Sequence, residues 1–232
     1  MERSFLEESL LINNAINVCL RMFCPRDLYT PAHCKTVSLF SGHFGAFLNL
    51  SREEINLLQL AGKAHDVAKL AWSDNLLQGK KKDELGDDYS NIFHHPKRGA
   101  SFLFDLLKEH TSNFKWVGLI LCHHWGYSKE EKHYPPLDDI DTQRSLKEYS
   151  WDLEDPKFKL MVGIIKVADS LHAAISNRVY REDPLPKQIP EAIAEIRGKM
   201  GTVYHPEVVA ALENTESQIK SLFEIDSQLH SF

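Results

Sequence analysis

The stretch LQLAGKAHDVAKLAW (58–72) places a histidine, an aspartate and a lysine inside an apolar run. Six aliphatic residues give this run the broad hydrophobic surface of a buried helix: Leu58, Leu60, Ala61, Ala64, Ala68 and Leu70. Burying an unpaired carboxylate is costly, so Asp66 must be neutralised by His65 and Lys69 or by a metal ion. The pair His65-Asp66 is therefore the starting point of a candidate metal site.

The size and composition of the chain are those of a soluble globular protein. Its 232 residues suffice for one large domain or two small ones, with 43% hydrophobic and 26% charged residues. The formal net charge of −6 argues against a long nucleic acid as partner, because such binding needs a basic surface. A small phosphorylated substrate remains compatible, since metal ions and a few local basic residues can neutralise it.

The cysteines and the N-terminus indicate a cytoplasmic protein. The 4 cysteines form no CxxC pair and are few for a disulfide scaffold. The N-terminal residues 1–20 are acidic and lack the basic start and long apolar stretch of a signal peptide. No segment reaches the ~18 apolar residues of a membrane span. We therefore expect no membrane association.

Hydrophobic periodicity predicts an all-α protein. A single domain with the HD motif is expected over residues 31–232, preceded by an N-terminal helical extension over residues 1–30. No alternating run is long enough to argue for a sheet. A helix is expected to begin at the capping box Ser51–Glu54 and to run through 58–72. The other helices are expected over 4–23, 31–48, 96–110, 113–124, about 142–149, 156–179, 184–200 and 205–223. Residues 73–93 are expected to form a polar loop, and 125–155 an otherwise irregular segment.

Several of these segments carry a histidine or an aspartate that could bind a metal. The candidate ligands are His33, His65, Asp66, His95, His123, His124 and Asp169. Imidazole and carboxylate donors without thiolate suit iron or manganese better than a cysteine-type structural zinc site. Neighbouring side chains on a helix diverge by ~100°, so His65-Asp66 could reach two ions with Asp66 bridging them. Lys69 shares that face and could neutralise a phosphate or hold the attacking water.

The remaining histidines and cysteines fit a structural role. A lone histidine on an apolar helix is usually a hydrogen-bonded core residue, which suits His43, His110, His172 and His205. Cys34 and Cys122 each adjoin a candidate ligand and are interpreted as small core residues.

Five further motifs follow His33 in order: HDVAK (65–69), HHPKRGASFL (94–103), ILCHHW (120–125), IIKVADSLHAAISNRVYR (164–181) and GTVYHPEVV (201–209). This order, over about residues 31–212, resembles the HD superfamily of metal-dependent phosphohydrolases. More narrowly, it resembles the HD-GYP family of cyclic-dinucleotide phosphodiesterases, whose motifs include a similar HDIGK. The resemblance implies a helical bundle and the same seven metal ligands. It also implies that Lys69 and Arg178 face the substrate phosphate.

The chain departs from the HD-GYP pattern after the paired histidines. The nearest match to the Gly-Tyr-Pro tripeptide is His133-Tyr134-Pro135, and Trp125-Gly126-Tyr127 is a poorer one. Tyr134 is accordingly the candidate substrate-binding residue of this loop. His172 and His205 stand where the family has aspartates. The resemblance therefore supports the metal ligands more strongly than it supports the family's substrate.

The resemblance implies hydrolysis of a phosphodiester in a cyclic dinucleotide, such as cyclic di-GMP, or a related nucleotide. Two divalent ions, iron or manganese, would activate a water through the bridging Asp66. Lys69 and Arg178 would stabilise the phosphoryl oxygens, with Asp66 and Lys69 as the catalytic pair. His124 is available for a third ion or for the scissile phosphate.

Two other functions stay open. The first is an oxidative diiron centre, since some HD-superfamily members use four histidines and two aspartates to activate oxygen. His124 and the NRVYR stretch (177–181) favour hydrolysis over it. The second is a non-catalytic nucleotide sensor, in which residues 125–140 plug the site. A signalling protein or a second copy of the chain is the expected protein partner.

Overall fold

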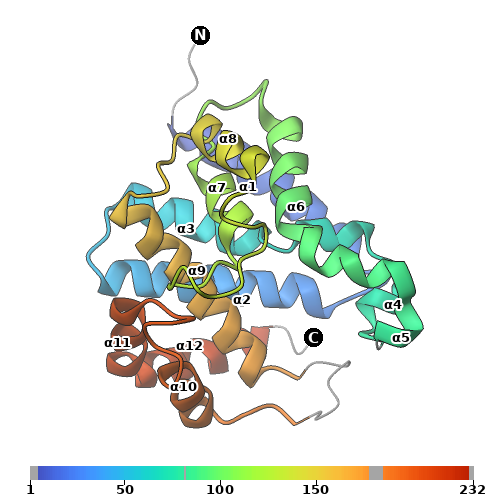
Figure 1. Cartoon of the computed structure of the whole chain (residues 1–232). Coiled ribbons are helices and arrows are strands. Elements are labelled where there is room, and N and C mark those ends of the chain that lie inside the picture. The colour runs from blue at the N-terminus through green and yellow to red at the C-terminus, as the bar shows by residue number, and fades with distance from the viewer. Residues whose placement is uncertain (1–4, 81, 178–184, 230–232) are drawn as a thin grey trace.

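The computed structural model describes residues 5–80, 82–177 and 185–229 (Figure 1). Within these ranges every regular element is a helix, and the one β-type feature is an isolated bridge between Met200 and Tyr204. The all-α prediction is confirmed. None of the described helices is long and apolar enough to cross a membrane.

The helices fall into ten longer elements and four short ones. The longer helices are α1 (Phe5–Phe23), α2 (Tyr29–Phe47), α3 (Arg52–Ala64), α6 (Asn91–Leu107), α7 (Lys115–Cys122), α8 (Ile140–Glu148), α9 (Pro156–Ile175), α10 (Ile189–Arg197), α11 (Pro206–Asn214) and α12 (Glu216–Leu229). The short elements are the 3₁₀ turns η1 (Val67–Ala71) and η2 (Gly86–Ser90) and the single-turn helices α4 (Asp74–Leu77) and α5 (Lys82–Leu85).

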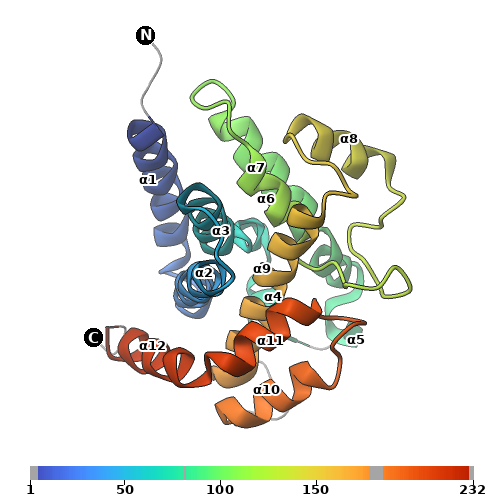
Figure 2. The same ribbon diagram turned by 90° about the vertical axis from the view of Figure 1, so that its left-hand side faces the viewer.

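Helix α9 is the central element of the bundle. It contacts α2 and α3 on one side, α7 on another, and α10 and α11 below, as the two views show (Figures 1 and 2). Its apolar residues point in all directions, and Ile164, Ile165 and Leu171 are fully buried. A helix that is hydrophobic all round is expected at the centre of a core. Asp169 therefore lies on a central and largely buried helix.

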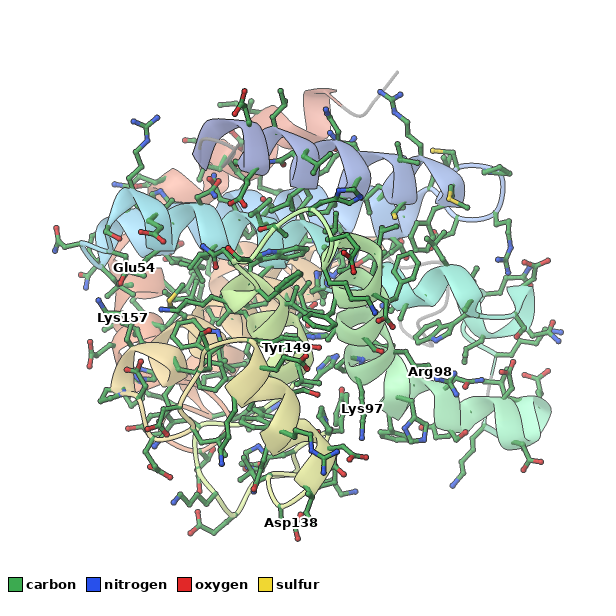
Figure 3. The ribbon with its side chains drawn as sticks, turned by 90° about the horizontal axis from the view of Figure 1, so that it is seen from above. Glu54, Lys97, Arg98, Asp138, Tyr149 and Lys157 are labelled. Carbon is green, nitrogen blue, oxygen red and sulfur yellow. The ribbon has the colours of Figure 1, made fainter. Side chains whose placement is uncertain are left out.

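Helices α2 and α3 approach each other at Gly62. A Cβ atom on this glycine would lie 2.9 Å from Cα of Ser38 on α2, so only glycine permits the contact. Helix α3 begins with the predicted capping box, in which Ser51 N–H donates to Glu54 Oε2 (2.8 Å) and Glu54 N–H donates to Ser51 Oγ (3.2 Å). Glu54 also pairs with Lys157 at the start of α9 (2.6 Å; Figure 3). These contacts fix α3 against α2 and α9.

The continuous helix predicted through 58–72 is wrong. Helix α3 ends at Ala64, and Asp66 has φ −101° and ψ 11° before the 3₁₀ turn η1 begins. The sequence AHDVAK contains no glycine or proline that would announce this break. The break turns His65 and Asp66 out of a regular helix and toward the residues described below.

The predicted start of the helix at Pro96 is also wrong, because α6 begins at Asn91 and contains Pro96. Proline has no N–H to donate to the carbonyl of Ile92, four residues earlier. His95 Nδ1 lies 2.6 Å from that carbonyl oxygen and donates to it instead. The helix can therefore pass through the proline with this carbonyl satisfied.

Other boundaries also differ from the prediction. Helix α2 begins at Tyr29 rather than Pro31, and Asp27 Oδ1 accepts from the N–H groups of Tyr29 (2.8 Å) and Thr30 (3.3 Å). The segment 73–93 is not a plain loop, since it contains α4, α5, η2 and the start of α6. Helices α7 and α9 end at Cys122 and Ile175, before the predicted ends.

Helix α1 packs against α2, α3 and η1. Its buried residues Ile12, Ile16, Leu20 and Phe23 join the same hydrophobic cluster as the rest of the bundle. The division of the chain into an extension over 1–30 and a domain over 31–232 stays a prediction.

Candidate metal centre

Five segments bring the predicted ligands together in the interior. Helix α2 supplies His33, the α3–η1 junction His65 and Asp66, α6 His95, the end of α7 His123 and His124, and α9 Asp169. His33, His65, Asp66, His95 and His123 are at most 2% exposed. The Asp169 side chain is 14% exposed, and His124 is also partly accessible. Access to the cluster is thus from the side of Asp169 and His124.

One group of donors surrounds the Nε2 atoms of His33 and His65, which are 3.2 Å apart. Asp66 Oδ2 lies 3.3 Å from His65 Nε2 and 3.8 Å from His33 Nε2. Asp169 Oδ1 lies 3.1 Å from His33 Nε2 and 4.0 Å from His65 Nε2. Two imidazole nitrogens and two carboxylate oxygens therefore face one point.

A second group consists of three imidazoles. His95 Nε2 lies 3.2 Å from Nε2 of both His123 and His124. The ligand atoms of these three residues all lie within 4.8 Å of one another, as do those of His33, His65 and Asp66. The described residues thus hold two adjacent donor clusters.

Asp66 lies between the two clusters. Its Oδ2 faces His65 and His33, while its Oδ1 lies 3.3 Å from His95 Nε2. A carboxylate that presents one oxygen to each cluster has the orientation needed to bridge two cations.

Backbone carbonyls orient three of the histidines by the same contact. Nδ1 of His65 donates to Gly62 O (2.8 Å), and Nδ1 of His123 donates to Ile120 O (2.6 Å). His95 makes the equivalent bond to Ile92 O. A carbonyl can only accept, so each Nδ1 carries a proton and each ring turns its Nε2 toward the cluster, where Nε2 offers a lone pair whenever the ring is neutral.

His33 is oriented by a different partner, His172. Their Nδ1 atoms are 2.7 Å apart, and His172 is only 5% exposed beneath the stacked ring of Tyr29. If His33 presents Nε2 as a lone pair, its Nδ1 donates and His172 Nδ1 accepts. His172 is thus a buried and hydrogen-bonded residue, as the sequence analysis expected, but that analysis did not foresee that its partner is a candidate ligand. Its position, where the resembling family has an aspartate, was the signal that could have revealed it.

The charges in the cluster compensate one another. Burial raises the pKa of Asp66, but Lys69 and His65 outweigh it and hold the pKa of that carboxyl well below its usual range. Burial likewise raises the pKa of Asp169, and the bond to His33 contributes to a net pKa well below the usual range. Both carboxylates are therefore ionised at neutral pH, and Lys69 Nζ lies 2.5 Å from Asp66 Oδ2.

Most of the imidazoles are neutral. Burial lowers the pKa of both His33 and His95 to about 4, and it lowers the pKa of His123 and His124 well below the usual range. His65 is the exception: burial lowers its pKa, but the facing Asp66 carboxylate and Cys34 outweigh burial and raise it well above the usual value. Four lone pairs are thus available at neutral pH, and a bound cation would displace the proton of His65.

The donor set fits a divalent ion of the iron or manganese type. Two buried carboxylates and five imidazoles supply oxygen and nitrogen but no thiolate. Cys34 Sγ lies 4.0 Å from Nδ1 of His65, on the ring edge that does not face the cluster. Burial raises the pKa of Cys122 well above its usual value, so this residue is a thiol.

Two of the three predicted substrate-binding residues, Tyr134 and Lys69, lie beside these clusters. Tyr134 stacks on His124 with ring centroids 4.3 Å apart, and it meets Phe93 edge to face. Lys69 is 16% exposed and is bound to Asp66. Arg178 lies outside the described residues. Lys166, which the sequence analysis did not consider, donates to the carbonyl oxygen of His124 (3.1 Å).

Comparisons with known proteins identify the family of the chain. The HD domain family matches residues 31–174, so the chain belongs to the HD domain family. It is 30% identical over 200 residues to a cyclic di-GMP phosphodiesterase of Thermotoga maritima, covering 85% of this chain and 48% of that protein. It is 27% identical over 200 residues to the cyclic di-GMP phosphodiesterase response regulator RpfG of Xanthomonas campestris, covering 85% of this chain and 46% of RpfG. The chain spans about half the length of these curated relatives.

Solved structures show the same fold. The HD domain of the L. monocytogenes phosphodiesterase PgpH superposes with a TM-score of 0.55 at 19% identity, covering 89% of this chain and 98% of that one. The same domain in complex with cyclic-di-AMP gives 0.54 at 17% identity, with coverages of 89% and 96%. At these identities the likeness concerns the fold.

Proposed function

We propose that the protein is a metal-dependent phosphodiesterase that hydrolyses a cyclic dinucleotide, with cyclic di-GMP as the first candidate. The observation that carries the proposal is the position of Asp66, whose two oxygens face two separate clusters of imidazoles. Two curated relatives are named cyclic di-GMP phosphodiesterases, which supports this substrate class.

Each cluster would hold one divalent ion, iron or manganese. His33, His65 and Asp169 would bind the first, and His95, His123 and His124 the second, with Asp66 shared. A pair of such ions supplies a hydroxide at neutral pH and a Lewis acid for the phosphoryl oxygens. The three imidazoles of the second cluster favour hydrolysis over the oxidative centre of four histidines and two aspartates. His124 remains the proposed ligand if a third ion binds.

The protein's own groups perform the remaining tasks. Lys69 holds Asp66 in place through its 2.5 Å contact and contributes a positive charge beside the attacked phosphate. Burial raises the pKa of Tyr134, so its phenol stays protonated and can donate to a phosphate oxygen. The Tyr134 ring also covers one face of the His124 imidazole. We retain Arg178 as a proposed phosphate contact on the strength of its motif.

The test combines metal analysis with a substrate screen. Purified protein loaded with Mn²⁺ or Fe²⁺ is expected to hold about two ions per chain and to cleave cyclic di-GMP, with cyclic di-AMP and bis-p-nitrophenyl phosphate as comparison substrates. Metal-loaded protein that cleaves none of the three contradicts the proposal. Oxygen uptake without phosphate-ester cleavage would instead support the oxidative centre. Cyclic di-GMP binding without turnover would support the sensor. A cytoplasmic location and a signalling-protein or self partner stay predictions.

A further inference from the structure

A second cavity lies beside the metal centre, with a volume of about 530 Å³. Its walls come from the segment 125–138, from α8 and α9, and from residues 203–205, and none of the seven proposed ligands lines it. In Figure 1 the segment 125–138 is the yellow-green coil that crosses in front of α9. Cavities that bind small molecules in proteins typically measure ~300–1,000 Å³, so this one has the right size.

Five aromatic rings line the cavity beside aliphatic and charged residues, namely those of Trp125, Tyr127, His133, Phe158 and His205. Trp125 meets Phe158 and His133 edge to face at 6.3 and 5.9 Å, and it is only 7% exposed. Tyr127 meets His205 edge to face at 4.8 Å. Such walls select a planar ring over a flexible aliphatic chain, because aromatic pairs have preferred stacked and edge-to-face geometries.

Almost all of the polar groups around the rings already make hydrogen bonds within the protein. Gly126 N–H donates to Nδ1 of His133 (3.2 Å), so Nε2 of that ring carries the proton and donates to Ser128 O (3.1 Å). Trp125 Nε1 donates to Pro135 O (2.7 Å). The exception is His205, whose ring makes no hydrogen bond to the part of the chain that the structure describes. Its Nδ1 is buried, so Nε2 is the nitrogen that a molecule in the cavity can reach.

The charged groups at the rim offer no net attraction for an anion. Lys129 and Lys159 both pair with Glu154, at 3.6 and 2.5 Å. Asp138 adds a negative charge at the outer edge of the molecule (Figure 3). A phosphorylated ligand would have to displace these pairs, so the cavity suits an uncharged molecule.

We propose that this cavity binds a neutral, planar heteroaromatic molecule. Its ring would lie among Trp125, Tyr127 and Phe158, and a ring nitrogen would pair with Nε2 of His205. The cavity and the metal centre share one wall, because Trp125 follows His124, and Tyr134 lies between His133 and Pro135. A ligand in the cavity therefore contacts the same segment that places Tyr134 on His124, which makes this a candidate regulatory site.

Indole and quinoline test the proposal, since both are neutral bicyclic rings but one donates and the other accepts a hydrogen bond. Each is titrated into the full chain and followed by amide and indole N–H shifts in NMR spectra. Saturable binding of either probe, with shifts centred on the cavity, is expected. Preference for indole means that His205 Nε2 accepts a hydrogen bond from the probe, and preference for quinoline means that Nε2 donates one. No saturable binding of either probe overturns the proposal.

Three variants locate the binding. Val162→Phe fills the cavity from α9, and Leu153→Trp fills it from the opposite wall, so one informative variant remains if the other fails to fold. Both are expected to weaken binding at least ~10-fold. His205→Phe keeps a ring but removes the nitrogen, and it should weaken the preferred probe by about 3- to 10-fold. If all three variants leave the affinity for the probes unchanged, the proposal that the probes bind in this cavity is wrong.

Charged analogues test the ligand class. Indole-3-acetate and tryptamine carry the same ring with a negative or a positive group, and each is expected to bind more weakly than indole. Tighter binding of either one contradicts the neutral class. The titrations use no cyclic dinucleotide and measure no turnover, so their outcome is independent of the phosphodiesterase proposal.

Discussion

The two regions on either side of His124 are held in place by different means. The ligand cluster is fixed by backbone carbonyls and by packed helices, with His65, His95 and His123 each bonded to a carbonyl three residues earlier. The segment 125–138 contains no helix and is fixed by a few contacts, such as those of Tyr127 and Ser128 with the backbone at 202–203. The ligand cluster is therefore held by the helical scaffold, whereas the segment is held by contacts between loops. This difference agrees with a chain that keeps the motifs of its family and departs from them after His124.

The largest effect is expected from Asp66→Asn, which removes the shared charge in the cluster. We expect kcat/KM to fall by at least ~10³-fold, because the lost metal and water activation amount to several kcal/mol and each ~1.4 kcal/mol is tenfold. Metal content should fall with it. Asp105→Asn is the matched control, since this side chain is 63% exposed and pairs only locally with Lys108. If Asp66→Asn and the unmodified chain have equal metal content and activity, the proposal that Asp66 bridges two ions is wrong.

Gly62→Ala tests how tightly the cluster's scaffold is packed. The added Cβ would lie 2.9 and 3.0 Å from backbone atoms of Ser38, which cannot move aside like a flexible side chain. We expect a loss of about 1–3 kcal/mol in the free energy of unfolding, measured by urea denaturation. Gly198→Ala is the control, because its nearest contacts would be 3.4 and 3.6 Å. If the urea midpoint of Gly62→Ala is unchanged, helices α2 and α3 can move apart without a loss in the free energy of unfolding.

Tyr134 should separate the roles of the two regions. Tyr134→Ala removes both the ring on His124 and the hydroxyl, and we expect kcat/KM to fall about 10-fold with the metal content unchanged. Tyr134→Phe keeps the ring and isolates the hydroxyl, so its effect should be smaller. Loss of metal in Tyr134→Ala would contradict the separation, because the segment would then be part of the ion site.

The pH dependence of the ion-free protein is the smallest of these effects. The pKa of His33 and His95 is about 4 in the folded protein and near 6.5 when unfolded, so the unfolded chain binds more protons between these values. Stability is therefore expected to fall as the pH is lowered from about 6.5 to about 4.

His65 opposes this trend, because its raised pKa adds stability on the acid side that is lost as the pH rises through that value. We expect a net fall in Tm of a few degrees, at about 2–4 °C per kcal/mol for a chain of this size. The measurement is thermal unfolding with and without Mn²⁺. The ion should raise the Tm near neutral pH and make its fall on acidification steeper, because a bound cation displaces the proton of His65 and so removes the opposing contribution. A Tm that rises on acidification contradicts the neutral state of His33 and His95.

The sequence by itself determined the residue types of the ligand set and the helical class. Apolar periodicity and the Ser51–Glu54 capping box are local properties, and the box appears in the structure as predicted. A buried aspartate beside a histidine needs a partner in any fold, so Asp66 could be singled out before its neighbours were known.

Only the tertiary structure decided how these residues meet. The break after Ala64 carries no local signal, and the contact of His33 with His172 joins residues 139 positions apart. The helix passes through Pro96 because a side chain, His95, replaces the missing backbone donor. The stacking of Tyr134 and the cavity beside it depend on segments that approach each other only after folding. Sequence patterns report periodicity along one chain, whereas these features depend on distances between segments.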